Sequence, residues 1–165
     1  MPLNKIIIIR HGEKPKDDTA IGLSNHGRRR AAALVAYLPV EFQPIDYIFA
    51  TKPSKASTRP LDTVVPLALS MNTKINTEFE DAEVKEFAEH VLTTSEYAGK
   101  TLLVCWHHGK IVDLVKYLGG QPPTEKWADD VFDRIWVIDY TGEASPSAPN
   151  VRDIAMRLMF GDSEK

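Results

Sequence analysis

The chain has 165 residues, of which 43% are hydrophobic and 26% charged, a composition typical of a soluble globular protein with one core. Its net charge of −3 argues against general binding to nucleic acid or to anionic membranes, because either partner favours a basic excess. No apolar stretch approaches the roughly 20 residues of a membrane span, and the first apolar run follows Met1 too closely for a secretory signal. We therefore expect a cytoplasmic protein with a single domain over residues 1–165, whose lone cysteine, Cys105, is a core residue in a reducing compartment.

Strands and helices are predicted to alternate from the start of the chain. Residues 6–9 are four consecutive isoleucines, which is typical of a strand buried on both faces. A helix is predicted over about 25–38, with Ser24 as its N-cap and Pro39 as its end. A short strand over 46–50 and a helix over about 57–69 follow, with Pro60 tolerated because it lies in the first turn of that helix.

The alternation continues through the second half. We expect a weak strand at 74–76, an amphipathic helix over 83–97, a buried strand over 101–106 and a helix over 110–118. Two late strands are predicted over 134–140 and 154–160, and the Pro/Ser/Gly-containing stretch between them is expected to be a mobile surface loop. This order predicts an α/β fold, a three-layer α/β/α sandwich around a mostly parallel sheet.

Basic side chains and histidines follow the predicted strand ends. Arg10 and His11 come directly after the first strand, Arg59 lies in the first turn of the second helix, and His107 and His108 follow the strand that ends at residue 106. Because parallel sheets bind ligands at the carboxyl ends of their strands, these groups are expected to share one cleft. Two imidazoles and two guanidiniums suit phosphoryl transfer, with a neutral ring nitrogen as nucleophile and arginines on the phosphate oxygens.

At these positions the sequence resembles the histidine phosphatase superfamily, the phosphoglycerate mutase-like group. Four segments carry the resemblance, in the family's order: Arg10-His11-Gly12-Glu13, the helix entrance at residues 23–31, Arg59 to Thr63, and His108-Gly109. The resemblance implies a phosphoglycerate mutase-like fold and a reaction without metal or other cofactor. His11 would become a phosphohistidine, Arg10, Arg59 and His108 would hold the phosphate oxygens, and water would release the phosphate.

The resemblance also bears on the nucleophile's surroundings. Nearby arginines would keep His11 neutral, and the carbonyl of Gly12 would orient its ring. His107 would either flank the pocket or pack on the opposite face. The rim of the site is expected from residues 14–20 and 121–133.

The proton donor to the leaving group is less evident. Glu83 is the preferred candidate among the carboxylates between Arg59 and the second histidine, although an acidic first turn that complements the helix dipole explains it equally well. Glu13 is better viewed as a supporting residue than as the donor. The other carboxylates of this segment are Glu78, Glu80, Asp81 and Glu86.

The function expected from these residues is that of a phosphatase acting on a phosphorylated small molecule or on a phosphohistidine protein. A mutase is not expected, because the chain lacks the long insertions with which mutases of the family enclose their substrates. The alternative is a non-catalytic module that keeps the pocket and binds a phosphate ligand or a protein with weak or no turnover. The sequence leaves the oligomeric state open.

Overall fold

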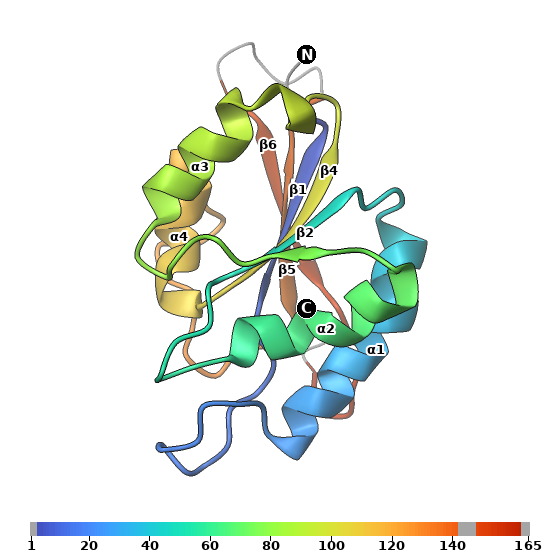
Figure 1. Ribbon diagram of the computed structural model, residues 1–165, viewed down its shortest axis with the longest axis vertical. Helices are drawn as coiled ribbons and strands as arrows, with labels where there is room; N and C mark the ends of the chain where they lie inside the picture. The colour runs from blue at the N-terminus through green and yellow to red at the C-terminus, as the bar shows by residue number, and fades with distance from the viewer. Residues whose placement is uncertain (1–2, 142–147, 163–165) are drawn as a thin grey trace.

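The computed structural model describes residues 3–141 and 148–162. Figure 1 shows one central sheet with helices on both sides. The elements in chain order are β1 (Lys5–Arg10), α1 (Asn25–Glu41), β2 (Tyr47–Ala50), α2 (Arg59–Met71), β3 (Ile75–Asn76), α3 (Val84–Thr93), a 3-10 turn (Ser95–Tyr97), β4 (Thr101–Trp106), α4 (His108–Tyr117), β5 (Arg134–Asp139) and β6 (Asn150–Ala155).

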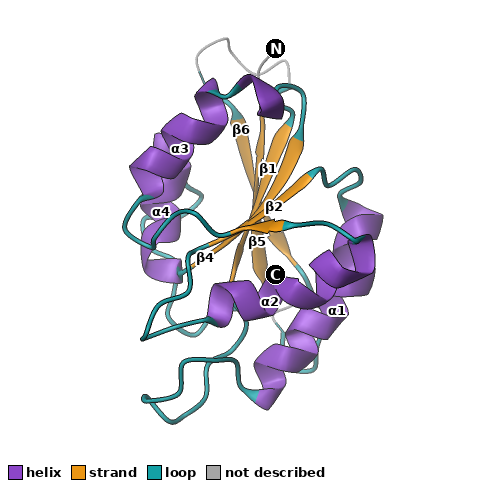
Figure 2. Cartoon of the chain, viewed as in Figure 1, coloured by secondary structure: helices purple, strands orange, loops and turns teal. Residues whose placement is uncertain are grey.

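The sheet has the strand order β3-β2-β4-β1-β5-β6. Strands β3, β2, β4 and β1 pair in parallel, and β5 is antiparallel to both of its neighbours, so it alone of the described strands runs against the rest. Figure 2 shows α1 and α2 on one side of the sheet and α3 and α4 on the other. The predicted three-layer α/β/α sandwich with a mostly parallel sheet is confirmed.

The isoleucine run of β1 serves both faces of the sheet because successive side chains of a strand point to opposite sides. Ile6 and Ile8 pack with α3 and α4, whereas Ile7 and Ile9 pack with α1 and α2. All four are fully buried, which explains why this strand shows no polar alternation. Cys105 lies on the same face as Ile7 and Ile9 and is fully buried, as expected for a core residue.

Two predicted helix ends need correction. Helix α1 begins after Ser24, whose hydroxyl accepts a hydrogen bond from Gly27 N, but it does not stop at Pro39. Proline removes one helical hydrogen bond, yet the last turn still closes through Phe42 N, which donates to Leu38 O. The helix predicted over 83–97 ends at Thr93 instead, and the 3-10 turn follows it.

The last strand was predicted over 154–160, which is wrong. Strand β6 starts earlier and pairs with β5 from Asn150, opposite Asp139, to Ala155, opposite Arg134. The long-range pairing with β5, and not a local run of apolar residues, therefore sets its limits. Residues 156–162, here called the C-terminal segment, leave the sheet after β6. Of the loop expected before β6, residues 142–147 lie outside the described residues. Within the described part of the chain, no helix is long and apolar enough to cross a membrane.

Candidate active site

His11 lies one residue beyond β1, at the carboxyl edge of the sheet. Its backbone N–H donates to Trp106 O on β4, which extends the strand pairing by one step. The side chain is buried, with 3% of the residue exposed, and its Nδ1 lies 2.7 Å from the carbonyl oxygen of Gly12. Since a carbonyl can only accept, Nδ1 carries the proton and Nε2 keeps its lone pair. The ring is therefore oriented as the resemblance implies, with the unprotonated nitrogen, Nε2, on its other side.

His107 is the second histidine that the structure brings to His11. Arg10 pairs with Trp106 across β1 and β4, so the next residues on the two strands, His11 and His107, lie side by side. Their ring centroids are 5.0 Å apart and the ring planes meet at 69°, an edge-to-face contact. This position follows from the strand register, and the sequence signal for it was present: each histidine directly follows its strand.

His108 is placed differently. It is the first residue of α4, and its Nε2 lies 3.2 Å from Asp129 Oδ1 on the loop that follows α4. The side chain of Asp129 is largely exposed, so this pair lies at the rim of the cleft. Of the two adjacent histidines, the structure thus brings His107 into ring contact with His11 and directs His108 toward the rim.

Arg10 is buried, with 2% of the residue exposed, and its guanidinium is held by the loop after α4. One terminal nitrogen, Nη1, donates to three carbonyl oxygens of that loop, and the ring of Phe132 lies 3.7 Å from Cζ. Its Nε is buried and has no hydrogen-bond partner among the described residues. Burial lowers the pKa of Arg10 to about 10, which leaves it charged at neutral pH. The carbonyls are those of Ala128 at 3.3 Å, Asp129 at 2.8 Å and Val131 at 2.8 Å.

Arg59 begins α2 and is held in a similar way. Its Nη1 donates to the carbonyls of Ala20 and Ile21 at 3.2 and 3.4 Å, and its Nε is buried without a partner among the described residues. The two arginines are thus fixed by backbone carbonyls of the two loops expected to form the rim. Buried donors without partners are rare in folded proteins, and two guanidinium Nε groups near one histidine indicate a site for an anion.

The rings of His11, which is buried, and of His107, which is half-buried, are held in their neutral form. Burial lowers the pKa of His11 to about 3 against the opposing effect of the Gly12 carbonyl, with further lowering from His107 when that ring is protonated and from the charges of Arg10 and Arg59. Burial also lowers the pKa of His107 to about 4, with a further contribution from Arg59. The arginines do favour a neutral nucleophile, as the sequence suggested, but desolvation is the larger cause. Both imidazoles are therefore uncharged at physiological pH.

The carboxylates of residues 78–86 differ in their surroundings. Glu83 accepts a hydrogen bond from Glu80 N at 2.7 Å, a local contact just before α3. Asp81 instead has a buried Oδ1 without a partner among the described residues, and burial raises its pKa. Its carbonyl oxygen accepts a hydrogen bond from Trp106 Nε1 at 3.0 Å, which places this turn beside the end of β4. Asp81 is thus the carboxyl of this segment that combines burial with a raised pKa.

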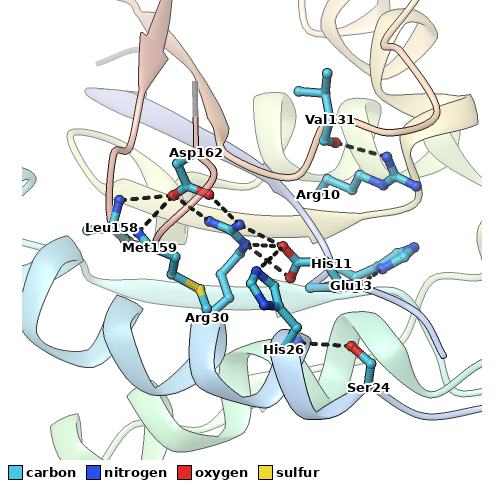
Figure 3. A network of polar contacts seen from close by, with 12 residues as sticks. Arg10, His11, Glu13, Ser24, His26, Arg30, Val131, Leu158, Met159 and Asp162 are labelled. Atoms are coloured by element: carbon cyan, nitrogen blue, oxygen red, sulfur yellow. Dashed lines mark hydrogen bonds and ion pairs between the residues drawn. The ribbon is translucent and has the colours of Figure 1, made fainter. Parts of the chain in front are cut away.

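A further set of residues supports the loop that carries His11. Figure 3 shows Glu13 bound to Arg30 of α1, and Arg30 bound in turn to Asp162 near the end of the chain. Sequence reasoning placed Glu13 as a supporting residue but missed Arg30 and Asp162. Arg30 lies in the helix entrance at residues 23–31, whereas no sequence signal marks Asp162. The described residues contain no group of three His, Cys, Asp or Glu side chains that could hold a metal ion.

No protein-family model matches the sequence, and no curated protein matches it. Solved structures do match. The mycobacterial glucosyl-3-phosphoglycerate phosphatase is similar with a TM-score of 0.60 at 14% identity, over 94% of this chain and 99% of that chain. The protein histidine phosphatase SixA, solved with tungstate, is similar with a TM-score of 0.60 at 15% identity, over 92% of this chain and 97% of that chain. The chain has the phosphoglycerate mutase-like fold.

The likeness includes a mutase as well as phosphatases. Phosphoglycerate mutase from Plasmodium falciparum matches this phosphoglycerate mutase-like chain with a TM-score of 0.60 at 14% identity, over 100% of this chain and 99% of that chain. The two chains therefore align over almost their whole lengths. Overall length and fold consequently do not separate a phosphatase from a mutase here, and the choice depends on the site itself.

Proposed function

We propose that this protein is a metal-independent phosphatase that hydrolyses a phosphomonoester or a phosphohistidine through a phosphohistidine on His11. One observation carries the proposal: a neutral, buried imidazole, with its Nδ1 proton fixed by Gly12 O, lies within electrostatic reach of two guanidinium groups whose Nε donors have no partner among the described residues. A nucleophile and an anion site are thereby combined at one edge of the sheet.

In the proposed reaction, Nε2 of His11 attacks phosphorus while Arg10 and Arg59 bind the phosphate oxygens. The bond from phosphorus to the leaving oxygen or nitrogen breaks, and its electron pair stays with the leaving atom, which takes up a proton. Water then attacks the phosphohistidine, and the P–N bond breaks to release inorganic phosphate and the neutral imidazole. No redox partner or metal ion is needed to balance these steps.

We assign the second histidine of the phosphate site to His107 in preference to His108. His107 contacts the ring of His11 edge to face and is half-buried, so we assign one of its ring nitrogens to a phosphate oxygen next to the nucleophile. His108 lies at the rim with Asp129. A rim position suits contact with the leaving group of the substrate better than contact with the transferred phosphoryl group.

We assign the proton donor to Asp81 in preference to Glu83. A general acid must be protonated at the working pH, and burial shifts the pKa of Asp81 in that direction. The carboxylate of Glu83 is engaged with Glu80 N, which fits the alternative explanation of Glu83 as part of the helix start. The charge of Lys110 opposes this shift in the pKa of Asp81.

The test is hydrolysis of an aryl phosphate in EDTA by the wild type, by His11→Ala and by His90→Gln, a histidine on α3 that contacts Tyr97. We expect activity in the wild type and in His90→Gln, none in His11→Ala, and an acid-labile, base-stable phosphoenzyme from radiolabelled substrate in the wild type. A requirement for added metal would contradict the mechanism. Phosphate binding without hydrolysis would favour the non-catalytic module instead.

The substrate class is tested with the same preparation. A panel of phosphorylated metabolites run beside a phosphohistidine protein separates the two proposed classes. Formation of a phosphate isomer from a phosphoglycerate, without release of inorganic phosphate, would identify a mutase. The similar solved structures include a protein histidine phosphatase and a sugar-phosphoglycerate phosphatase, so both classes belong in the panel.

A further inference from the structure

The peptide between Gly12 and Glu13 fixes the nucleophile. Its carbonyl oxygen, Gly12 O, accepts the hydrogen bond from His11 Nδ1. The preceding peptide is held by Gly12 N, which donates to Thr63 Oγ1 at 2.8 Å, and the following one by Glu13 O, which accepts from Ser24 N at 2.9 Å. A rotation of the Gly12–Glu13 peptide would remove the acceptor that holds the proton on His11 Nδ1.

The side chain of Glu13 also helps to fix this peptide, because Arg30 binds its carboxylate (Figure 3). Arg30 Nε donates to both carboxylate oxygens of Glu13, at 3.0 and 3.1 Å, and Nη2 donates to Oε1 at 2.6 Å. Arg30 itself is 2% exposed, so this ion pair is largely shielded from water and from salt. His26 adds a weaker contact, with Nε2 3.5 Å from Glu13 Oε1.

The other side of the Arg30 guanidinium binds Asp162 of the C-terminal segment. Nη1 donates to Oδ2 at 3.0 Å and Nη2 to Oδ1 at 2.7 Å, a two-point contact between side chains that are 3% and 5% exposed. The same carboxylate accepts hydrogen bonds from the N–H groups of Leu158 and Met159. Burial alone would raise the pKa of Asp162, but the hydrogen bonds from Arg30 and from these amides hold it below its usual value.

We propose that Arg30 and Asp162 are positioning residues that set the tautomer of His11 through Glu13, which makes the C-terminal segment part of the catalytic apparatus. The inference rests on the proposed function for its effect on turnover. The path is short and continuous: Asp162 fixes Arg30, Arg30 fixes Glu13, and the Glu13 backbone fixes the carbonyl that binds Nδ1. Among the contacts of the described residues, neither Arg30 nor Asp162 has a hydrogen bond or ion pair with His11, Arg10 or Arg59, so the path through Glu13 is the direct one.

The chemistry of the junction requires arginine and two carboxylates. A planar guanidinium can donate in pairs to carboxylates on two of its edges, whereas a lysine ammonium is a single point charge. The guanidinium of Arg30 donates to both carboxylates, so loss of either one would leave buried N–H donors without an acceptor. The C-terminal segment is therefore expected to matter for the geometry of His11 and not only for the closure of the fold.

The experiment compares the wild type with Asp162→Asn, Arg30→Lys and the control Arg29→Lys, which alters an exposed arginine on the same helix. Long-range ¹H–¹⁵N NMR spectra of the His11 ring report the tautomer directly and need no activity. Steady-state hydrolysis of an aryl phosphate gives kcat and KM, and thermal unfolding shows which variants are folded at the assay temperature.

We expect Asp162→Asn and Arg30→Lys to shift His11 away from the form protonated at Nδ1. kcat should fall about tenfold, the scale found when the partner that orients a functional histidine is lost, with KM within about twofold because Arg10 and Arg59 are untouched. Arg29→Lys should match the wild type. If Arg30→Lys does not fold, Asp162→Asn decides the question.

A folded Asp162→Asn variant with an unchanged His11 tautomer and unchanged kcat would overturn the inference. So would an equal loss of kcat in Arg29→Lys. Failure of the proposed function is distinguishable, because in that case the wild type is inactive while the NMR spectra still report whether the junction orients His11.

Discussion

His107 meets His11 edge to face, and the two residues occupy equivalent positions on neighbouring parallel strands. The pairing of Arg10 with Trp106 places both rings at one height above the sheet edge. The histidine pair is thus a product of strand register, which in turn depends on the two fully buried strands β1 and β4.

The first prediction separates the adjacent histidines. We expect His107→Ala to lower kcat/KM for an aryl phosphate by about 10²–10³-fold, the cost of one lost donor to a developing oxyanion. His108→Ala should lower it by less than about tenfold, because its contact with Asp129 is at the rim and exposed. If His108→Ala had the larger effect, His108 would be the second catalytic histidine, as the sequence predicts.

The second prediction concerns the pH dependence of activity. The pKa values of His11 and His107 are lowered by burial to about 3 and about 4, so both rings are neutral throughout the range in which free histidine titrates near ~6.5. The acidic limb of kcat/KM, corrected for ionisation of the substrate, should therefore lie below pH 5. A limb near the ordinary histidine pKa would contradict a buried neutral nucleophile.

The third prediction concerns the pH dependence of stability. As pH falls below the unfolded-state pKa near ~6.5, the unfolded chain binds protons at these histidines while the folded chain does not. Their contribution to the free energy of unfolding is thus fully present above that pH and is lost progressively toward pH 4, as the pKa of His107 at about 4 is approached. Chemical denaturation at several pH values should show a smaller loss in His11→Asn than in the wild type.

The fourth prediction tests the proton donor. Asp81→Asn should reduce kcat/KM for an alkyl phosphate at least about tenfold while leaving an aryl phosphate nearly unaffected, because a good leaving group needs no protonation. Glu83→Gln is the matched control and should leave the ratio of the two substrates unchanged, since its carboxylate is engaged with Glu80 N. A changed ratio in Glu83→Gln alone would restore the assignment made from the sequence.

The fifth prediction uses two glycines in helices. A Cβ at Gly27 would lie 2.5 Å from Glu13 O and 2.8 Å from Glu13 N, both backbone atoms, so Gly27→Ala should cost about 1–3 kcal/mol in the free energy of unfolding and should reduce activity. A Cβ at Gly109 meets nothing within 4 Å, and Gly109→Ala should be neutral or stabilising by up to about 1 kcal/mol. Equal effects of the two substitutions in urea unfolding would show that helix packing against Glu13 is not the cause.

The features that could be predicted from the sequence are those that depend on residues close together in the chain. Uninterrupted apolar runs identified β1 and β4, and the residues that directly follow their ends identified His11 and the neighbourhood of His107. The sequence favours His108 as the second catalytic histidine, whereas the ring contact with His11 favours His107; that contact depends on where β4 ends and α4 begins. Helix α4 starts at His108, two residues before the predicted start, and this turns His108 toward Asp129.

Features that depend on contacts between residues far apart in the sequence could not be predicted from local patterns. Strand β6 is defined by its pairing with β5, so the apolar residues at 154–160 misplaced it. The contact of Arg30 with Asp162 spans 132 positions of the chain and has no local pattern. The burial that lowers the pKa of His11 is likewise a property of the folded cleft, whereas the two arginines that contribute to it are visible in the sequence.

Arg10 is anchored by main-chain carbonyls of residues 128, 129 and 131, and no side chain of that loop supplies an acceptor in these three bonds. Because every amino acid carries the same carbonyl, residues 128–130 can be exchanged without releasing the arginine. The side chains of this loop can therefore change without loss of the three hydrogen bonds that hold the Arg10 guanidinium.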